Sequence, residues 1–156
     1  MLAREKLLGG EGIASDAAPL TEVVLRLLEE GCEVHVMRDP TRGGIAAALN
    51  EIARQSQVSV EIEEALVPVR PGVAAACEAL GLDVFQVANE GKMLIFVAPE
   101  DAARALALVK ESRYGRMARL IGEVGSGPPG RVTVRTVIGT ARLLDPPSGD
   151  LLPRIC

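Results

Sequence analysis

The stretch VHVMRDPTRGGIAAALNEIARQS, residues 34–56, predicts a strand, a polar loop and a helix in immediate succession. Its first residues alternate in polarity and are β-branched, which is typical of a strand with Val34 and Val36 on one face and His35 on the other. From Ile45 onwards, apolar side chains recur at helical spacing. A strand that leads directly into a helix is the repeating unit of α/β folds, so this class is expected.

Periodicity and turn residues predict further elements on both sides of this stretch. Helices are expected at residues 20–31, 45–56, 70–80 and 99–111, and strands at 33–37, 58–62, 92–98, 119–124, 131–136 and 141–144. Thr21 or a neighbour should cap the first helix and Gly31 should end it, while residues 83–87 are ambiguous and suit one helical turn. Because hairpins follow the alternating part, we expect a mixed sheet flanked by helices, with strand 92–98 at its centre.

The bulk composition is that of one globular domain with an aliphatic core. The 156 residues include two Phe, one Tyr and no Trp, and 24% of them are charged. Seventeen basic and twenty-one acidic side chains give a net charge of −4, and no basic run is interleaved with aromatics, so nucleic acid is not an expected partner. No apolar run approaches the roughly 20 residues of a membrane span. The start is unlike a signal peptide, and a cytoplasmic location without membrane attachment is expected.

The three cysteines, Cys32, Cys77 and Cys156, favour neither a disulfide framework nor a metal site. Their number is odd, their spacing is wide, no CxxC pair occurs, and the chain has one histidine. Cys32 and Cys77 lie beside or within predicted regular elements, where cysteine usually serves as a small buried hydrophobe. Cys156 follows a proline-rich approach, so its thiolate could carry an attached group between active sites, or it could be incidental in a frayed end.

The loop RDPTRGG, between the first strand and its helix, combines features of an anion-binding site. Gly43 and Gly44 permit close backbone approach, the beginning of a helix supplies partial positive charge, and Arg42 can clamp a phosphate or a carboxylate. The same residues also fit a tight turn in which Asp39 and Thr41 cap the helix. Spacing and composition leave both interpretations open.

A second polar cluster, ANEGK at residues 88–92, lies between two apolar stretches. If partly desolvated, Glu90 could act as a general base, and Lys92 could neutralise a phosphate. An ordinary turn with solvated side chains is the commoner setting for such residues. Asp16, in SDAAP, is either a helix cap or a polar group of a site.

Four parts of the chain together are similar to the HypE family of hydrogenase maturation proteins, in the AIR-synthase-related superfamily. They are SDAAPL (15–20), RDPTRGG (38–44) followed by LNEIA (49–53), ANEGK (88–92) and LPRIC (152–156). The resemblance implies an α/β (α+β) C-terminal domain with partial ferredoxin-like topology at residues 13–145. It also implies a remnant of an interdomain connection at 1–12 and a mobile tail with an acceptor cysteine at 146–156.

The resemblance implies a chemistry as well. In this family a partner, HypF, places a carbamoyl group on the terminal cysteine, here Cys156, and the product is dehydrated with ATP and Mg²⁺ to a thiocyanate. The cyano group then passes to iron held by HypC and HypD, for the nickel–iron hydrogenase centre. Glu90 is the candidate base, and Lys92 and Arg42 would offset phosphate charge. Further residues implied in substrate or phosphate binding, or in the tail, are Asp39, Thr41, Gly43, Gly44, Asn89, Pro153, Arg154 and Ile155.

The ATP and Mg²⁺ site of the family lies mostly in an N-terminal domain for which this sequence shows no counterpart. We therefore expect the isolated chain to bind neither ligand, to hold no metal and to be inactive as a dehydratase. A full-length homodimer and an isolated monomer are expected. Two other functions fit the residues: a non-catalytic carrier module that presents Cys156, and another ATP-dependent AIR-synthase relative in which Cys156 is incidental.

Overall fold

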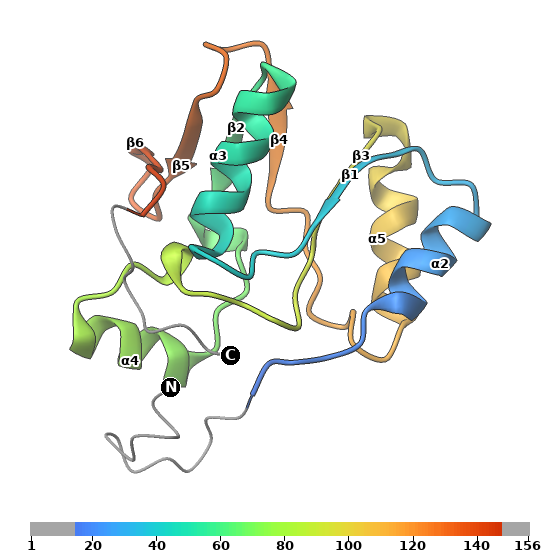
Figure 1. The fold of residues 1–156 in the computed structure, drawn as a ribbon, viewed down its shortest axis with the longest axis horizontal. Helices are drawn as coiled ribbons and strands as arrows, with labels where there is room; N and C mark the ends of the chain where they lie inside the picture. Colours follow the sequence, from blue (N-terminus) through green and yellow to red (C-terminus); the bar gives the residue numbers. More distant parts are fainter. Residues whose placement is uncertain (1–14, 148–156) are drawn as a thin grey trace.

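The computed structural model describes residues 15–147 of the chain (Figure 1). The predicted remnant at 1–12 and the tail residues 153–156, with the acceptor cysteine, lie outside the described residues. Within the described part, helices and strands occur close to their predicted positions.

The regular elements follow one another along the chain as helices, strands and short 3-10 turns. The α-helices are α2 (Thr21–Glu29), α3 (Gly44–Ser56), α4 (Pro71–Leu80) and α5 (Ala102–Glu111), and the 3-10 turns are η1 (Glu64–Leu66), η2 (Val84–Gln86) and η3 (Pro99–Asp101). The strands are β1 (Val34–Arg38), β2 (Ser59–Glu63), β3 (Leu94–Val97), β4 (Gly122–Gly125), β5 (Val132–Arg135) and β6 (Ala141–Leu143). The ambiguous residues 83–87 contain the single turn η2.

The strands form two sheets. The larger has the order β4-β2-β5-β6, in which β2 runs antiparallel to β4 and parallel to β5, so the predicted mixed sheet is confirmed. The smaller is the antiparallel pair β1-β3. Figure 1 shows α3 packed on the larger sheet, and α2 and α5 together on the far side of β1 and β3. The α/β class with helices flanking a mixed sheet is therefore confirmed.

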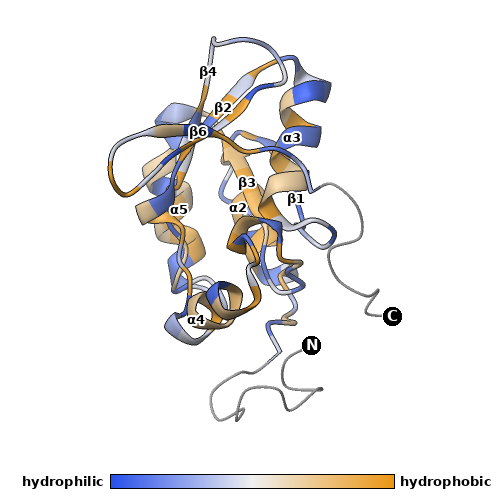
Figure 2. Cartoon of the chain, turned by 90° about the vertical axis from the view of Figure 1, so that its left-hand side faces the viewer, coloured by the Kyte–Doolittle hydropathy of each residue, from blue (hydrophilic) through white to orange (hydrophobic). Residues whose placement is uncertain are grey.

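The predicted central position of strand 92–98 is wrong, because β3 pairs with β1 alone among the described residues. Its apolar sequence has another cause, since its two faces meet different hydrophobic clusters. Leu94 belongs to the cluster between α3 and the larger sheet, and Phe96 packs against it. Ile95 and Val97 pack against the cluster between α2 and α5. In Figure 2, β3 and much of α2 carry the colours of hydrophobic residues.

Strand β1 contains an irregularity that the sequence pattern does not predict. The pairing register with β3 shifts between Val34 and Val36, so simple alternation fails there. Val34 and Met37 both pack against the α2–α5 cluster, and the prediction that Val34 and Val36 share a face is not met. His35 is exposed, as expected for a strand residue without a site role.

Helix α2 begins without a side-chain cap and ends on a glycine. Leu20 is the N-cap residue and no side chain caps the helix there, so the predicted cap at Thr21 is wrong. At the other end Gly31 adopts φ +67°, and the N–H of Cys32 donates to the carbonyl of Leu27 (3.0 Å), which is a Schellman ending. The predicted end at Gly31 is confirmed.

The start of α3 is in backbone contact with η2. Gly43 and Gly44 have φ +66° and +61°, a region that disfavours side chains. A Cβ on Gly44 would lie 2.5 Å from the carbonyl oxygen of Phe85 and 2.6 Å from that of Val87. Glycine is thus required at position 44 both by its backbone conformation and by its neighbours.

Gly44→Ala should lower the free energy of unfolding by about 3 kcal/mol or more, because left-handed strain adds to the clash. Gly81→Ala is a matched control, since Gly81 has φ +65° but an added Cβ would meet no atom within 4 Å. The free energy of unfolding of Gly81→Ala should fall by only about 1 kcal/mol. Urea unfolding of the two variants and the wild type measures both values, and equal losses would contradict the contact with η2.

Candidate functional site

The two predicted polar loops lie side by side. The backbone N–H of Asn89 donates to the carbonyl of Pro40 (3.0 Å), and the Pro40 side chain is fully buried. The Asn89 side-chain amide donates to the carbonyl of Val87 (2.7 Å) and so keeps its Oδ1 free to accept. The RDPTRGG loop and the ANEGK cluster, which are far apart in sequence, therefore form one surface.

The segment before α2 completes this surface. Lys92 Nζ donates to Asp16 Oδ2 (3.2 Å) and to Asn89 Oδ1 (2.8 Å), and the N–H of Glu90 donates to Asp16 Oδ2 (3.3 Å). Asp16 caps no helix, since α2 begins at Thr21. Of its two predicted roles, the structure favours a polar group of a site.

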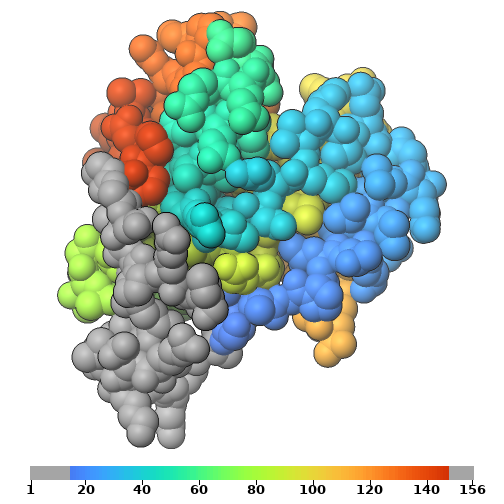
Figure 3. Space-filling view, in the orientation of Figure 1, coloured from blue at the N-terminus to red at the C-terminus, as the bar shows by residue number. Residues whose placement is uncertain are grey.

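A cavity of about 300 Å³ opens beside the joined loops. Its apolar wall is formed by Leu20, Val24, Leu25 and Met93. Two carboxylates, those of Asp39 and Glu90, line the same cavity. In Figure 3 the segment before α2, the 38–44 loop and the residues near position 90 meet on the face shown, in blue, cyan and yellow-green. A small polar group that enters here meets two acids against an apolar wall.

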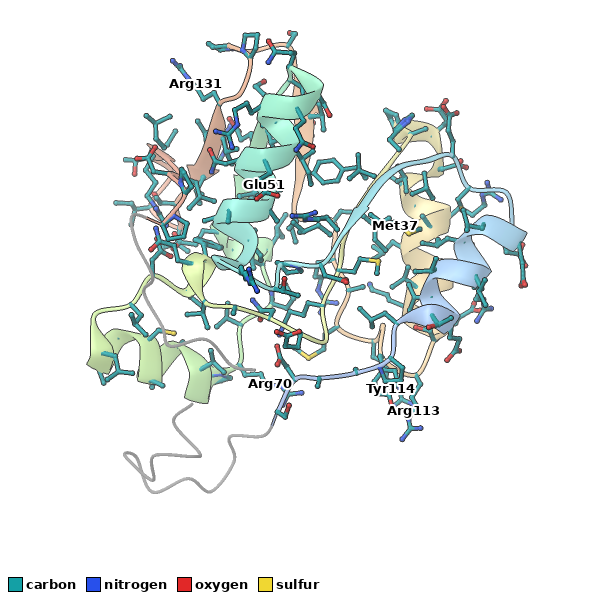
Figure 4. The ribbon with its side chains drawn as sticks, viewed as in Figure 1. Met37, Glu51, Arg70, Arg113, Tyr114 and Arg131 are labelled. Carbon is teal, nitrogen blue, oxygen red and sulfur yellow. The ribbon has the colours of Figure 1, made fainter. Side chains whose placement is uncertain are left out.

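A second, more polar cavity of about 240 Å³ shares Asp39 with the first as a lining residue. Arg38 Nη2 donates to Oε2 of Glu51 (2.5 Å), which lies on α3 and is labelled in Figure 4. The charge of the Arg38 guanidinium is therefore already neutralised. Arg42 also lines the cavity and forms no ion pair with any residue from 15 to 147. Arg42 is thus the cation of this cavity that is available to an anion.

The structure decides between some of the alternatives for these loops. The N-cap of α3 is Gly43 and has no side-chain partner, so the interpretation of Asp39 and Thr41 as helix caps is wrong. Gly44 is buried against η2, which gives it a packing role beside any role in binding. Glu90 is exposed, so the described residues do not provide the partial desolvation that would favour it as a base.

Residues near the end of the described chain also reach this surface. Asn50 Nδ2 donates to the carbonyl of buried Leu144 (2.6 Å), and a Cβ on Gly43 would lie 2.8 Å from Pro147 Cγ. The chain therefore leaves the described part beside the RDPTRGG loop. Sequence reasoning identifies LNEIA as a motif but misses this anchoring by Asn50, for which helical periodicity carries no signal.

Cys32 and Cys77 are buried and unpaired in disulfides, as predicted for structural cysteines. Burial, and to a lesser extent the negative charge of Asp83, raises the pKa of the Cys77 thiol. Among residues 15–147, no group of three or more His, Cys, Asp or Glu side chains could hold a metal ion. No helix in the same range is long and apolar enough to cross a membrane.

Comparison with known proteins assigns the class. The family model described as "AIR synthase related protein, C-terminal domain" matches residues 2–135. The chain therefore belongs to this family, in agreement with its mixed sheet and flanking helices. Three of the four segments that resemble HypE fall within the match, and LPRIC (152–156) lies beyond it.

Individual relatives narrow the class further. Carbamoyl dehydratase HypE of Bradyrhizobium diazoefficiens is 47% identical over 157 residues, covering 100% of this chain and 45% of the relative. A crystal structure of hydrogenase maturation protein HypE has a TM-score of 0.94 at 43% identity, over 99% of this chain and 50% of that chain. The resemblance to HypE is confirmed.

Two further solved structures are informative because of what they contain. One is HypE in complex with ATP, with a TM-score of 0.91 at 42% identity over 99% of this chain and 47% of that chain. The other is a HypE–HypF complex, with a TM-score of 0.88 at 42% identity over 94% of this chain and 48% of that chain. The present chain spans about half the length of the relatives it matches.

The raised pKa of Cys77 and its burial predict slow alkylation. At pH 8, iodoacetamide should label Cys77 at least about tenfold more slowly in the native chain than in urea, because only the exposed thiolate reacts. Peptide mass spectrometry at timed quenches gives the rate at each cysteine. Equal native and denatured rates at Cys77 would contradict its burial.

Proposed function

We propose that this chain is the part of a carbamoyl dehydratase that carries the acceptor cysteine, Cys156, and one wall of the dehydration site. The observation that carries the proposal is the position of Pro147 against Gly43, because it starts the tail beside the joined polar loops. The names of the relatives, carbamoyl dehydratase and hydrogenase maturation protein, support the same reaction.

Chain length is compatible with delivery of the thiol to either cavity. Nine residues, 148–156, follow Pro147. Fully extended they span at most about 30 Å. Both cavities are lined by Asp39, four residues before Gly43, so they lie within that reach. A thiol on this tether can also turn outward to a second protein.

The chemistry converts R–S–CO–NH₂ into R–S–C≡N, which removes one oxygen and two protons. ATP supplies the phosphoryl group with which the oxygen departs as phosphate. The nitrogen must lose both protons as the C≡N bond forms, so a base must stand beside it. Glu90 is the proposed base, since its carboxylate lines the cavity and forms no ion pair with a described residue.

Cations near Asp39 suit the phosphate that leaves. Arg42 has an uncommitted, exposed guanidinium in the polar cavity, beside Thr41, and the first N–H groups of α3 lack intrahelical acceptors. Lys92 is the second proposed cation: its ammonium donates to Asp16 and Asn89, and its third N–H has no acceptor among the described residues. The amides of Gly43 and Gly44 and the side chain of Asn89 complete the proposed substrate-binding set.

Partners follow from the same proposal. A HypF protein would supply the carbamoyl group, in line with the HypE–HypF complex among the similar structures. An assembly of HypC and HypD would receive the cyano group on iron. ATP, with Mg²⁺, would bind mostly to the half of the relatives that this chain does not match. The use of ATP itself is supported by the similar structure of HypE in complex with ATP.

Cys156→Ala should abolish carbamoylation by a HypF protein, because the acceptor sulfur is gone. Intact-mass measurement after incubation with HypF and carbamoyl phosphate should show the added carbamoyl group on the wild type only. Cys77→Ala, at a buried cysteine, is the control and should be modified as the wild type is. Modification of the Cys156→Ala chain would refute the acceptor assignment.

Glu90→Gln should lower the rate of ATP-dependent thiocyanate formation about 10²- to 10⁴-fold, the usual contribution of a general base. The protein tested contains this chain together with the other half of its relatives, and the carbamoyl group is loaded beforehand. Glu100→Gln removes an exposed acid on η3, outside both cavities, and should have no effect. A near-normal rate for Glu90→Gln removes Glu90 from the mechanism.

A further inference from the structure

The ammonium group of Lys92 is held between two oxygens. Asp16 Oδ2 lies 3.2 Å from Nζ and Asn89 Oδ1 lies 2.8 Å from it. The two acceptors come from different parts of the chain, one before α2 and one within the ANEGK cluster. The side chains of Lys92 and Asp16 are 46% and 39% exposed, so the pair sits at the rim of the site and not in the core.

The backbone brings Asp16 to this position independently of the ion pair. A Cβ on Gly91 would lie 1.5 Å from the carbonyl oxygen of Asp16 and 2.9 Å from the backbone nitrogen of Ala18. The chain before α2 thus lies directly on Gly91. Asp16 is placed by this contact, and its carboxylate meets Lys92 and the N–H of Glu90 as a result.

The arrangement leaves the Glu90 carboxylate without a cationic partner among the described residues. Lys92 is the basic side chain of the ANEGK cluster, two residues away, yet Glu90 forms no ion pair with any described residue. Lys92 is paired with Asp16 instead. A carboxylate paired with an ammonium ion is a weaker base than a free one, because the pair favours the charged form.

We propose that Asp16 is a positioning residue that holds Lys92 away from Glu90, so that the Glu90 carboxylate stays free to take a proton. The role in catalysis rests on the proposed function of Glu90 as the base. The placement of Lys92 away from Glu90 rests only on the positions of these side chains. Without the Asp16 carboxylate, Lys92 turns to Glu90 and neutralises it.

The direction of the pH effect follows from the charges around Glu90. Asp39 lines the same cavity, the Asp16 carboxylate accepts from the backbone N–H of Glu90, and Lys92 is the cation of the cluster. In Asp16→Asn, the loss of one negative charge and the approach of Lys92 both favour ionised Glu90. Its titration therefore moves to lower pH. The Lys92→Met background separates the lost charge of Asp16 from the approach of Lys92.

The first experiment needs no activity. Carbon-detected NMR of the Glu90 carboxyl in this chain should show the titration midpoint lower by at least about 0.5 pH units in Asp16→Asn than in the wild type. In the Lys92→Met background, Asp16→Asn should shift the midpoint by much less. An absent shift, or an equal shift in both backgrounds, overturns the proposal.

The second experiment tests the catalytic consequence. In the protein that contains this chain and the other half of its relatives, Asp16→Asn should lower the rate of thiocyanate formation about tenfold and move the acidic limb of its pH profile to lower pH. It should add little to the loss already caused by Lys92→Met. Additive losses, or an unmoved limb, would mean that Asp16 acts only on folding.

The controls separate this claim from stability and from the proposed function. Glu61→Gln breaks a comparably exposed ion pair with Arg135 on the larger sheet and should leave rate and profile unchanged. Asp16→Glu keeps the charge and should restore most of the rate. Thiocyanate formation by the wild type tests the proposed function by itself, and the NMR shift decides the positioning role whether or not that reaction occurs.

Discussion

One backbone hydrogen bond, from the N–H of Asn89 to the carbonyl of Pro40, joins the two chain segments that connect the two packed units of this molecule. One packed unit contains α3 and the larger sheet, and the other contains α2, α5 and the β1–β3 pair (Figure 1). The chain passes between these units through residues 38–44, from β1 to α3, and again through the ANEGK cluster, from η2 to β3. Because the two passages are bonded to each other and the Pro40 side chain is fully buried, the positions of the two polar loops are coupled. Asp39 from one loop and Glu90 from the other line the same cavity, so its shape depends on this contact.

Backbone contacts hold the site together more than charges do. The ion pairs around it, Arg38–Glu51 and Lys92–Asp16, are partly exposed, and such pairs contribute about 0–1 kcal/mol each. In contrast, Gly44 and Gly91 lie so close to other backbone atoms that no side chain fits there. The fold therefore depends less on these ion pairs than on the backbone contacts, which leaves the charges available for the proposed binding and proton transfer.

Local sequence predicts the elements of this fold well and their assembly less well. Periodicity locates α2 to α5 and each strand, because burial repeats along an element. It misplaces β3 at the centre of a sheet, since a strand between two hydrophobic clusters has the same apolar pattern as a strand between two strands. It also cannot detect the irregularity in β1, which depends on pairing with a distant segment.

The candidate site shows the same division. Residue types and the resemblance to HypE identify the two polar loops, but their contact through Pro40 is a long-range feature. Sequence leaves two roles open for Asp16, because nothing near it in the chain indicates that Lys92 and Glu90 lie beside it. The caps expected at Thr21, Asp39 and Thr41 do not form, since Leu20 and Gly43 precede α2 and α3 without side-chain partners.

The anchoring of Leu144 by Asn50 has a kinetic meaning for the proposed carrier. A reactive group joined by a linker of a few residues to a fixed point beside its target has an effective concentration of about the millimolar range. Return of the loaded cysteine to its own site is then a first-order event that does not depend on protein concentration. Hand-over to another protein depends on how often that partner arrives. Competition between these two rates would set how long the cargo stays with its carrier.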